Sequence, residues 1–334
     1  MRTLLAIVIL AALGWSGWWF VQSTARDRAM TGWLEERRAA GWVAEAAEVR
    51  VGGFPSRVDT VVSGLNLSDP EAGWSWHADG LQVLSLSYKP NHVIAVLTGE
   101  QVVSTPYETL RANSDRLRGS VIFRPTTRLE LDHSTFEIEN MRISGDAGWT
   151  ATIGKAILAT RQAAAGTPFA HDVAFNAESL ALPAEVIDGL GADGILPADV
   201  GPIAIDATLV FDRPWDRHTV ESDNPVLEEV EIRDLALTWG KVDLRGQGTL
   251  AVDAQGFAEG RLDLRARNWE RMLDVAEASG ALDPTLAGAV RAGLGLIARL
   301  SGDRNALDVP LDFRDGTARL GPIPLGPAPR LAQR

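Results

Sequence analysis

The amino-terminal part of the chain contains an uncharged apolar run, residues 4–21, that constrains where the rest of the protein can fold. As an α-helix rising about 1.5 Å per residue, this run would extend about 27 Å. That length is close to the thickness of the hydrocarbon core of a bilayer, about 30 Å. The run therefore predicts a transmembrane helix within residues 1–22.

The flanks of the run favour an uncleaved signal anchor. A cleaved signal peptide has an apolar core of about 7–15 residues and a cleavage site of small residues. Here the run is longer, residues 22–26 form a poor cleavage site, and the run ends in aromatic side chains suited to a membrane interface. A removed signal peptide and a buried soluble helix remain alternatives. The predicted anchor residues are Leu4, Ile7, Leu10, Trp15, Trp18, Trp19 and Phe20.

The charge of the chain excludes some partners and suggests a location. Its 32 Lys and Arg residues are outnumbered by 44 Asp and Glu residues, for a net charge of −12. An acidic body of this kind has no electrostatic basis for binding nucleic acid or an anionic membrane surface. Arg2 favours a cytoplasmic amino terminus, although Arg26 and Arg28 follow the run closely. We expect a single-pass protein of a bacterial inner membrane, with its body in the periplasm.

The absence of cysteine from the sequence fits this location, because no disulfide is needed and thiol chemistry is impossible.

After the anchor, a second helix is predicted over residues 23–41, within a juxtamembrane segment 23–46 that lies on the following sheet. Its apolar residues recur at three- and four-residue steps, Ser23 or Thr24 can cap it, and Gly41 can end it. Plain packing is the favoured role of this helix, and partner binding is the alternative.

From residue 47 the apolar period changes to two, which is typical of β-strands. A first hairpin has its turn at residues 52–55. Further strands are predicted at 65–67, 74–78, 81–86, 93–98, 117–123, 127–132, 135–143, 149–160, 172–182, 203–211, 227–239, 242–252, 257–267, 307–313 and 317–320. Residues 106–115 are predicted to be a looser connection.

Three helical stretches interrupt the strands. A short helix is predicted at 183–190, and Asn268 is predicted to cap a helix over 269–279. Asp283 and Pro284 open another helix that ends at Leu300. Its predicted buried stripe consists of Leu286, Val290, Leu294, Ile297 and Leu300. The predicted divisions are a β-sheet half at 47–190, a boundary at 191–202, a second half at 203–325 with a helical insert at 268–301, and a tail at 326–334.

A weak internal repeat supports an extended sheet. Residues 65–74 and 141–149 share a strand with alternating apolar residues, a short turn and a Trp, and residues 235–240 contain a reduced version. A long sheet must curl or pack on itself because its twist accumulates. The predicted fold class is mainly β with α (α+β): an N-terminal transmembrane helix, then a long curled antiparallel sheet of repeated hairpins with a few covering helices. Ordinary hairpin similarity is the alternative explanation.

The chain shows no catalytic, cofactor-binding or metal-binding motif. The five histidines, His77, His92, His133, His171 and His218, have no metal-ligand spacing and no Ser/His/Asp order. The Gly246-Gln247-Gly248 segment lies in a strand pattern rather than before a helix, unlike a phosphate loop. Acidic pairs such as Asp69 and Glu71 are interpreted as solvated turn charges, although paired acids for hydrolysis remain open. We therefore predict no enzyme activity and no cofactor.

Apolar surface is what remains as a candidate site. Trp74, Trp76 and Trp149 lie at equivalent points of the repeat, next to strands that place branched residues on one face. If the curled sheet lacks a full covering layer, that face is a hydrophobic trough, and a lipid tail or acyl chain is its natural occupant beside a membrane. A dry packed core is the alternative for each Trp.

Four segments resemble the bacterial domain of unknown function 2125 family: residues 53–59, 73–76, 88–94 and 309–326. The resemblance covers nearly the whole chain, and its motifs are turns that carry no catalytic residue. The family is similar in layout to AsmA-like envelope proteins, which have an N-terminal anchor and long periplasmic β-sheets and are implicated in lipid movement. The resemblance implies a lipid-holding or assembly-assisting role, since this chain is too short for a continuous conduit.

Together these observations predict a non-enzymatic, membrane-anchored periplasmic protein that binds lipid or another hydrophobic ligand for envelope homeostasis. The alternative is a dry-core scaffold whose sheet and acidic surface bind envelope proteins. An unrecognised hydrolase is a third hypothesis.

Overall fold

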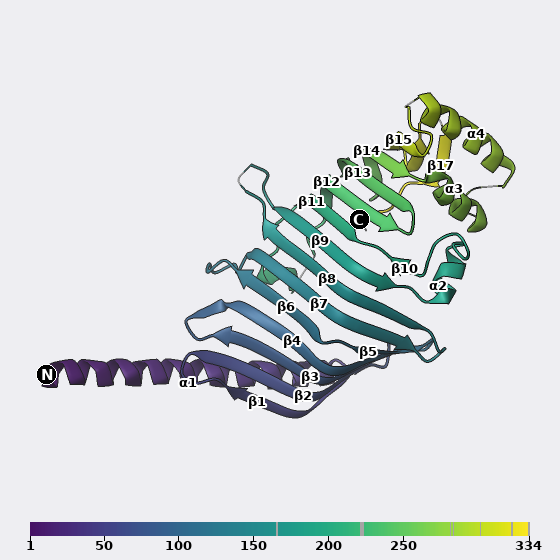
Figure 1. The fold of residues 1–334 in the computed structure, drawn as a ribbon. Coiled ribbons are helices and arrows are strands. Elements are labelled where there is room, and N and C mark those ends of the chain that lie inside the picture. Colours follow the sequence, from purple (N-terminus) through teal and green to yellow (C-terminus); the bar gives the residue numbers. More distant parts are fainter. Residues whose placement is uncertain are drawn as a thin grey trace. The chain divides into compact units, whose positions relative to one another are not determined.

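The computed structural model describes residues 1–164, 166–220, 224–280, 282, 284–300, 302–321 and 323–332. Asp283, which opens a predicted helix, lies outside these residues, and the side chain of Leu286 is not described. The structure is mostly antiparallel sheet, with a long apolar helix at the amino terminus and a few shorter helices, which confirms the predicted fold class. Figure 1 shows the order of the elements along the chain.

The chain divides into two compact units. The first unit comprises Met1–Pro125 and Phe136–Gly148, and the second comprises Thr126–Thr135 and Trp149–Arg334. The predicted halves at 47–190 and 203–325 stay a prediction about separate domains.

The first unit consists of one helix and a sheet of antiparallel strands (Figure 1). Its elements are α1 (Arg2–Ala39), β1 (Val43–Gly52), β2 (Arg57–Asp69), β3 (Trp74–Leu86), β4 (Lys89–Ser104), β5 (Thr109–Asn113), β6 (Arg116–Phe123) and the part of β7 (Leu131–Gly145) from Phe136 onward. Successive hairpins pair β1 with β2, β2 with β3 and β3 with β4, and β4 then pairs with both β5 and β6. Strand β5 lies in the predicted loose connection, so that expectation is wrong.

The predicted anchor and the predicted juxtamembrane helix form one uninterrupted helix, α1. This helix ends at Ala39, and Gly41 follows with φ of +88°, which lets the chain turn into β1 at Val43. Helical structure therefore does not extend to residue 46. Arg37 and Arg38 in the last turn complement the negative end of the helix dipole.

Helix α1 packs through its second half on one face of β1 to β3. The core of this unit consists of Leu34, Ala44, Val62, Leu65, Leu67 and Ala78, with Met30 and Trp76 packed against it. Alternate residues of each strand point to the same face, so the apolar positions of β2 and β3 together form the surface on which α1 lies. The first half of α1 has no such neighbour: Leu4 is 70% exposed and Leu10 is 68% exposed.

The second unit continues the hairpin pattern and carries the remaining helices. Its elements are β8 (Thr150–Gln162), β9 (Ala170–Ala181), α2 (Ala184–Gly189), β10 (Asp199–Val200), β11 (Ile203–Phe211), the 3-10 helix η1 (Arg217–Val220), β12 (Leu227–Trp239), β13 (Val242–Val252), β14 (Ala258–Arg267), α3 (Trp269–Ala278), α4 (Pro284–Leu300), β15 (Ala306–Arg314), β16 (Thr317–Leu320) and β17 (Ile323–Pro327). Strands β8, β9 and β11 to β17 form antiparallel neighbours in that order.

Two local predictions in the second unit are wrong. Of the strand predicted at 127–132, only Leu131 and Asp132 lie in a strand, β7; residues 127 and 128 form a turn, and Leu129 has φ of +53°. The backbone there is held instead by hydrogen bonds that join Leu131 to Trp215 and Arg217 to Arg128. Asn268 does occupy the N-cap position of α3, but its side chain donates to the Lys241 carbonyl oxygen rather than capping the helix.

The predicted buried stripe of α4 is correct only in part. Val290 and Leu294 are buried in a core with Trp269 and Leu273 of α3, whereas Ile297 is 36% exposed and Leu300 is 79% exposed. The buried face follows Ala287, Val290, Leu294 and Ala298. Ala298 supplies the contact expected of Ile297 because a helix with 3.6 residues per turn returns to the same face after four residues as readily as after three.

Candidate functional site

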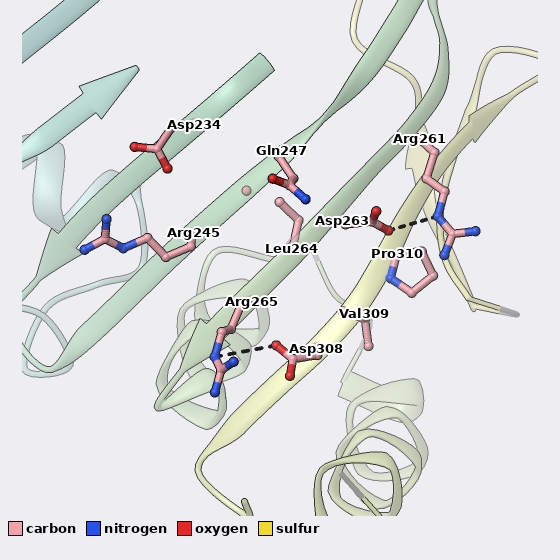
Figure 2. Close-up of a pocket in the computed structure, with 11 residues that line it drawn as sticks. Asp234, Arg245, Gln247, Arg261, Asp263, Leu264, Arg265, Asp308, Val309 and Pro310 are labelled. Atoms are coloured by element: carbon pink, nitrogen blue, oxygen red, sulfur yellow. Dashed lines mark hydrogen bonds and ion pairs between the residues drawn. The ribbon is translucent and has the colours of Figure 1, made fainter. Parts of the chain in front are cut away.

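A polar depression of about 510 Å³ lies on strands β12 to β15 of the second unit (Figure 2). Its charged residues are three arginines and three aspartates: Arg245, Arg261, Arg265, Asp234, Asp263 and Asp308. Two of the pairs are ionic contacts between half-exposed side chains, Arg261 with Asp263 at 3.0 Å and Arg265 with Asp308 at 3.7 Å. Exposed ion pairs of this kind contribute little to stability, and their balanced charge favours no particular ligand.

An apolar cavity of about 380 Å³ lies in the first unit, between α1 and the sheet. We call it the α1 groove. Its lining residues are Arg26, Ala29, Met30 and Trp33 from α1, Thr60, Leu65 and Leu67 from β2, and Trp76, Leu81 and Val83 from β3. The volume is within the range of about 300–1,000 Å³ for small-molecule sites, and the predominance of apolar lining is typical of them.

The groove forms because the residues that point inward change from even-numbered to odd-numbered positions in both strands of its floor, β2 and β3. In β2 the inward positions change from Thr60 and Val62 to Leu65, and in β3 they change from Ala78 to Leu81. The strand register skips Gly64 between Ser63 and Leu65, and skips Asp79 between Ala78 and Gly80. One residue is skipped on each strand, so β2 and β3 stay in register there. In the β3–β4 pairing, Gly99 and Glu100 of β4 lie opposite Asp79 alone, and this β-bulge bends the sheet.

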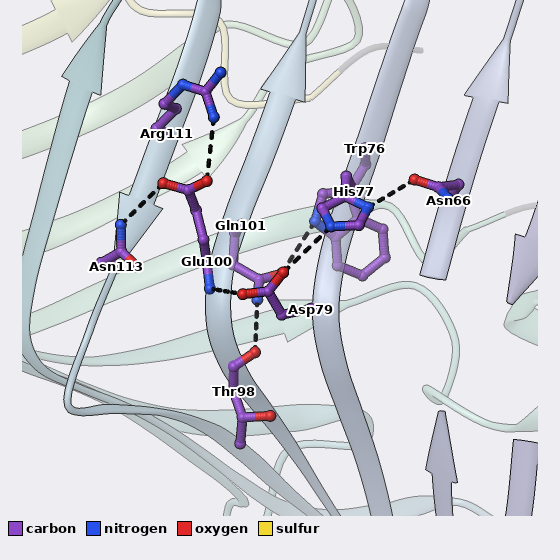
Figure 3. Close-up of polar contacts among 9 residues, drawn as sticks. All are labelled: Asn66, Trp76, His77, Asp79, Thr98, Glu100, Gln101, Arg111 and Asn113. Atoms are coloured by element: carbon purple, nitrogen blue, oxygen red, sulfur yellow. Dashed lines mark hydrogen bonds and ion pairs between the residues drawn. The ribbon is translucent and has the colours of Figure 1, made fainter. Parts of the chain in front are cut away.

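The bend continues into β4 and is held by the carboxylate of Asp79 (Figure 3). One oxygen of this carboxylate accepts a hydrogen bond from the backbone N–H of Glu100 at 2.7 Å, and the other lies 3.3 Å from the His77 ring. These two hydrogen bonds lower the pKa of Asp79. Gly99 has φ of +73°, and a Cβ there would be 2.5 Å from Asp79 Oδ2. Only glycine therefore fits without displacing Asp79.

His77 in this group resembles part of a catalytic arrangement but has two acceptor neighbours. Its Nδ1 lies 2.7 Å from Asn66 Oδ1, and its Nε2 faces Asp79 (Figure 3). Within the described part of the chain no hydroxyl group bonds to this ring. His92 does contact a hydroxyl, Ser120 Oγ, at 2.9 Å, but no described carboxylate orients its other nitrogen. The absence of enzyme activity stays a prediction.

The three candidate tryptophans have different surroundings. Trp76 lines the α1 groove, and its indole N–H donates to Gln101 Oε1 at 3.2 Å (Figure 3), which satisfies its polar atom and orients the ring. Trp74 packs edge-on against Trp42, with 5.2 Å between the ring centroids. Trp149 belongs to the second unit and does not line the groove. The equivalent positions in the repeat therefore do not make equivalent sites.

Arg26 is the groove residue that sequence analysis did not propose. Its Nη2 donates to Ser85 Oγ at 2.8 Å, and burial lowers the pKa of this guanidinium. Among the described residues, no carboxylate lies within ion-pair distance of Arg26. Its spacing from Met30 and Trp33, four and seven residues, places all three on one helix face and was the available signal.

The predicted anchor is not free along its whole length. The indole N–H groups of Trp15, Trp18 and Trp19 donate to the carbonyl oxygens of Pro55, Ser87 and Arg57, at 2.9, 3.3 and 2.5 Å. Trp19 is only 8% exposed. The end of the apolar run therefore lies against the turns β1–β2 and β3–β4, while the anchor residues Leu4, Ile7 and Leu10 remain exposed.

The fold and the groove define a class of protein: a mainly antiparallel β protein that begins with a helix long and apolar enough to cross a membrane. The chain belongs to the family described as "Uncharacterized protein conserved in bacteria (DUF2125)", whose match covers residues 18–329. This confirms the family resemblance, and the further likeness to AsmA-like proteins finds no support in these comparisons. No curated protein and no solved structure matches the chain.

Proposed function

We propose that this protein is held in a bacterial inner membrane by α1 and binds an amphiphilic molecule with an acyl chain, without catalysis, in the service of envelope homeostasis. The observation that carries the proposal is the apolar α1 groove, built partly from the same helix that is apolar enough to cross a membrane. A ligand that leaves or enters the bilayer along α1 would find apolar surface on Met30, Trp33 and the facing strands.

The shape of the groove suits an extended chain. The lining residues run from the cross-strand pair of Thr60 and Val83 to that of Leu67 and Trp76. At about 3.3 Å per residue, these seven steps correspond to about 23 Å. The change of inward positions within β2 and β3 keeps the lining residues before and after it on one face of the sheet, and the proposed acyl chain lies along that face.

The polar end of the groove indicates the charge of the ligand. Arg26 lies beside Ser85, two residues beyond Val83 and thus at the end of the groove nearest the strand turns. A half-buried guanidinium with a neutral hydroxyl partner gains most from an anion, because charge-assisted hydrogen bonds are about twice as strong as neutral ones. We therefore propose an anionic head, a carboxylate or a phosphate, at Arg26.

The proposal is tested by titrating the full-length protein in detergent with a fluorescent fatty acid. Ala29→Trp fills the groove and should abolish saturable binding, whereas Ala39→Trp, the same substitution at an exposed position of α1 outside the groove, should leave binding unchanged. Arg26→Met should weaken fatty-acid binding about 10- to 100-fold, the equivalent of a charged hydrogen bond, and leave binding of the matching fatty alcohol unchanged. Equal binding by all variants would reject the groove.

The second candidate function is a scaffold that binds envelope proteins. Leu296 and Leu300 on α4 are 58% and 79% exposed, and an exposed apolar helix face favours a protein contact. If neither the native chain nor Ala29→Trp binds the fatty acid saturably, that result would favour this scaffold.

A further inference from the structure

The turns β1–β2 and β3–β4 are fixed beside α1 at a defined level of the helix. Trp15 and Trp19 bond to the first turn and its following strand, and Trp18 bonds to the second turn. Gln22 Nε2 adds a further hydrogen bond to the Ser87 carbonyl oxygen at 2.9 Å. The sheet is thus attached to α1 from Trp15 onward.

The part of α1 that precedes Trp15 is too short to cross a bilayer alone. Residues 2–14 extend about 20 Å at 1.5 Å per residue, whereas the hydrocarbon core is about 30 Å thick. If α1 crosses the membrane, residues 15–21 must complete the span. The two turns attached to these residues then reach the membrane surface.

The side chains exposed at the turns suit such a surface. Phe54 is 54% exposed, Tyr88 is 58% exposed and Phe20 of α1 is 62% exposed. The Phe54 ring lies 5.3 Å from the Trp19 ring and 6.4 Å from the Phe20 ring. Trp and Tyr are enriched in the headgroup region of a bilayer. Trp18 and Trp19 bond to the turns at this level, and Tyr88 follows Ser87, the partner of Trp18. We call Phe20, Phe54 and Tyr88 the aromatic edge.

The segments that form the two turns are less acidic than the chain as a whole. Residues 49–58 and 80–99 contain no Asp or Glu, although the whole chain has 44 such residues. Arg50 and Arg57 form ion pairs with the flanking Glu48 and Asp59, at 2.6 and 2.9 Å, and Lys89 lies in the second turn segment. The turns are therefore close to neutral, and the acidic charge of the chain does not repel a bilayer from them.

We propose that the aromatic edge is a second membrane contact, in which Phe54 and Tyr88 enter the headgroup region of the bilayer that α1 crosses and fix the sheet at the membrane surface. This contact depends on α1 as the span and is independent of any ligand in the groove. It would hold the Arg26 end of the groove close to the lipid headgroups.

Site-directed spin labelling of the full-length protein in vesicles of zwitterionic and anionic phospholipid tests this contact. The chain has no native cysteine, so Phe54→Cys and Tyr88→Cys each give one labelling site. Tyr107→Cys is the matched control, because Tyr107 is 96% exposed in the β4–β5 connection. Leu10→Cys marks the span. We expect labels at positions 10, 54 and 88 to collide with oxygen and to lose collisions with a water-soluble nickel chelate, while position 107 shows the reverse.

Two outcomes would overturn the proposal. Water-exposed labels at 54 and 88 beside a buried label at 10 would show that α1 spans without the aromatic edge. A water-exposed label at 10 as well would show that α1 does not span. Phe54→Cys removes a ring contact with Trp19, so Tyr88, which makes no ring contact among the described residues, keeps the test valid if that variant misfolds.

Discussion

Gly99 and Asp79 are the residues on which the bend of the first unit depends. The carboxylate of Asp79 occupies the space where any side chain at position 99 would begin, and it holds the backbone of Glu100 across the gap. This contact joins the β-bulge at Gly99 and Glu100 of β4 to Asp79 of β3. The phase change that turns Trp76 and Leu81 to the same face follows from it.

Gly99→Ala should therefore destabilise the first unit by about 2–3 kcal/mol, from a left-handed backbone penalty of about 1–2 kcal/mol and the displacement of Asp79. Gly148→Ala is the matched control, because Gly148 has φ of +94° but open space around a Cβ. Urea titration followed by circular dichroism measures both. Equal losses in the two variants would contradict the role given to Asp79.

Asp172 in β9 should make the second unit sensitive to acid. Burial alone would raise the pKa of Asp172, but hydrogen bonds from Thr208, Arg233 and Arg161 outweigh burial and lower it. A carboxyl group with a lowered folded-state pKa stabilises the fold above its unfolded pKa, near 3.9, and this stabilisation is lost as the pH falls through the folded pKa.

Asp172→Asn should lower stability at neutral pH and reduce the loss of stability below about pH 4. Thermal unfolding between pH 7 and pH 2 measures this, with Asp193→Asn, at an exposed turn position, as the control. If Asp172→Asn loses as much stability below about pH 4 as the native chain does, other groups cause the acid sensitivity.

Among the elements, α1 combines in one helix the two segments that the sequence predicts separately, an anchor and a juxtamembrane helix. Its first part is exposed and apolar, and its second part is a packed helix of the first unit, with the tryptophans at the junction bonded to strand turns. The attachment depends most on Trp19, which is both buried and bonded to the Arg57 carbonyl oxygen.

Trp19→Ala should cost about 3–5 kcal/mol of the free energy of unfolding of the first unit, the usual range for a buried tryptophan. Trp18→Ala should cost about 1 kcal/mol, because Trp18 is 50% exposed and loses mainly one hydrogen bond. Urea titration in detergent separates the two. Similar small losses would mean that the sheet is not held to α1 through Trp19.

Much of the strand order could be predicted from the sequence because alternation of apolar residues survives in single hairpins. The strand predicted at 127–132 failed before Leu131 because the alternation of Thr127 and Leu129 with charged residues also fits a turn, and β7 begins only at Leu131. The groove could not be predicted, because the change of inward-facing side chains depends on the pairing of β3 with both β2 and β4, which residues distant in sequence determine. Arg26 was missed because a charged residue in a helix is usually solvent-exposed.

Three features of the whole molecule belong to one chain: an apolar helix, an acidic body and an apolar groove with a cation at one end. Helix α1 is both the apolar helix and one wall of the groove, so the proposed ligand site lies on the same helix that is proposed to cross the membrane. A carrier or holder of membrane-derived amphiphiles requires this adjacency, whereas a scaffold with a dry core does not.

Photo-crosslinking shows whether an acyl chain lies in the α1 groove. The full-length protein in vesicles is irradiated with a fatty acid that carries a diazirine on its chain, and the modified peptides are mapped by mass spectrometry. We predict crosslinks in residues 26–33, 60–67 and 76–83, and their loss in Ala29→Trp but not in Ala39→Trp. Crosslinks confined to residues 4–21, unchanged by Ala29→Trp, would contradict the account.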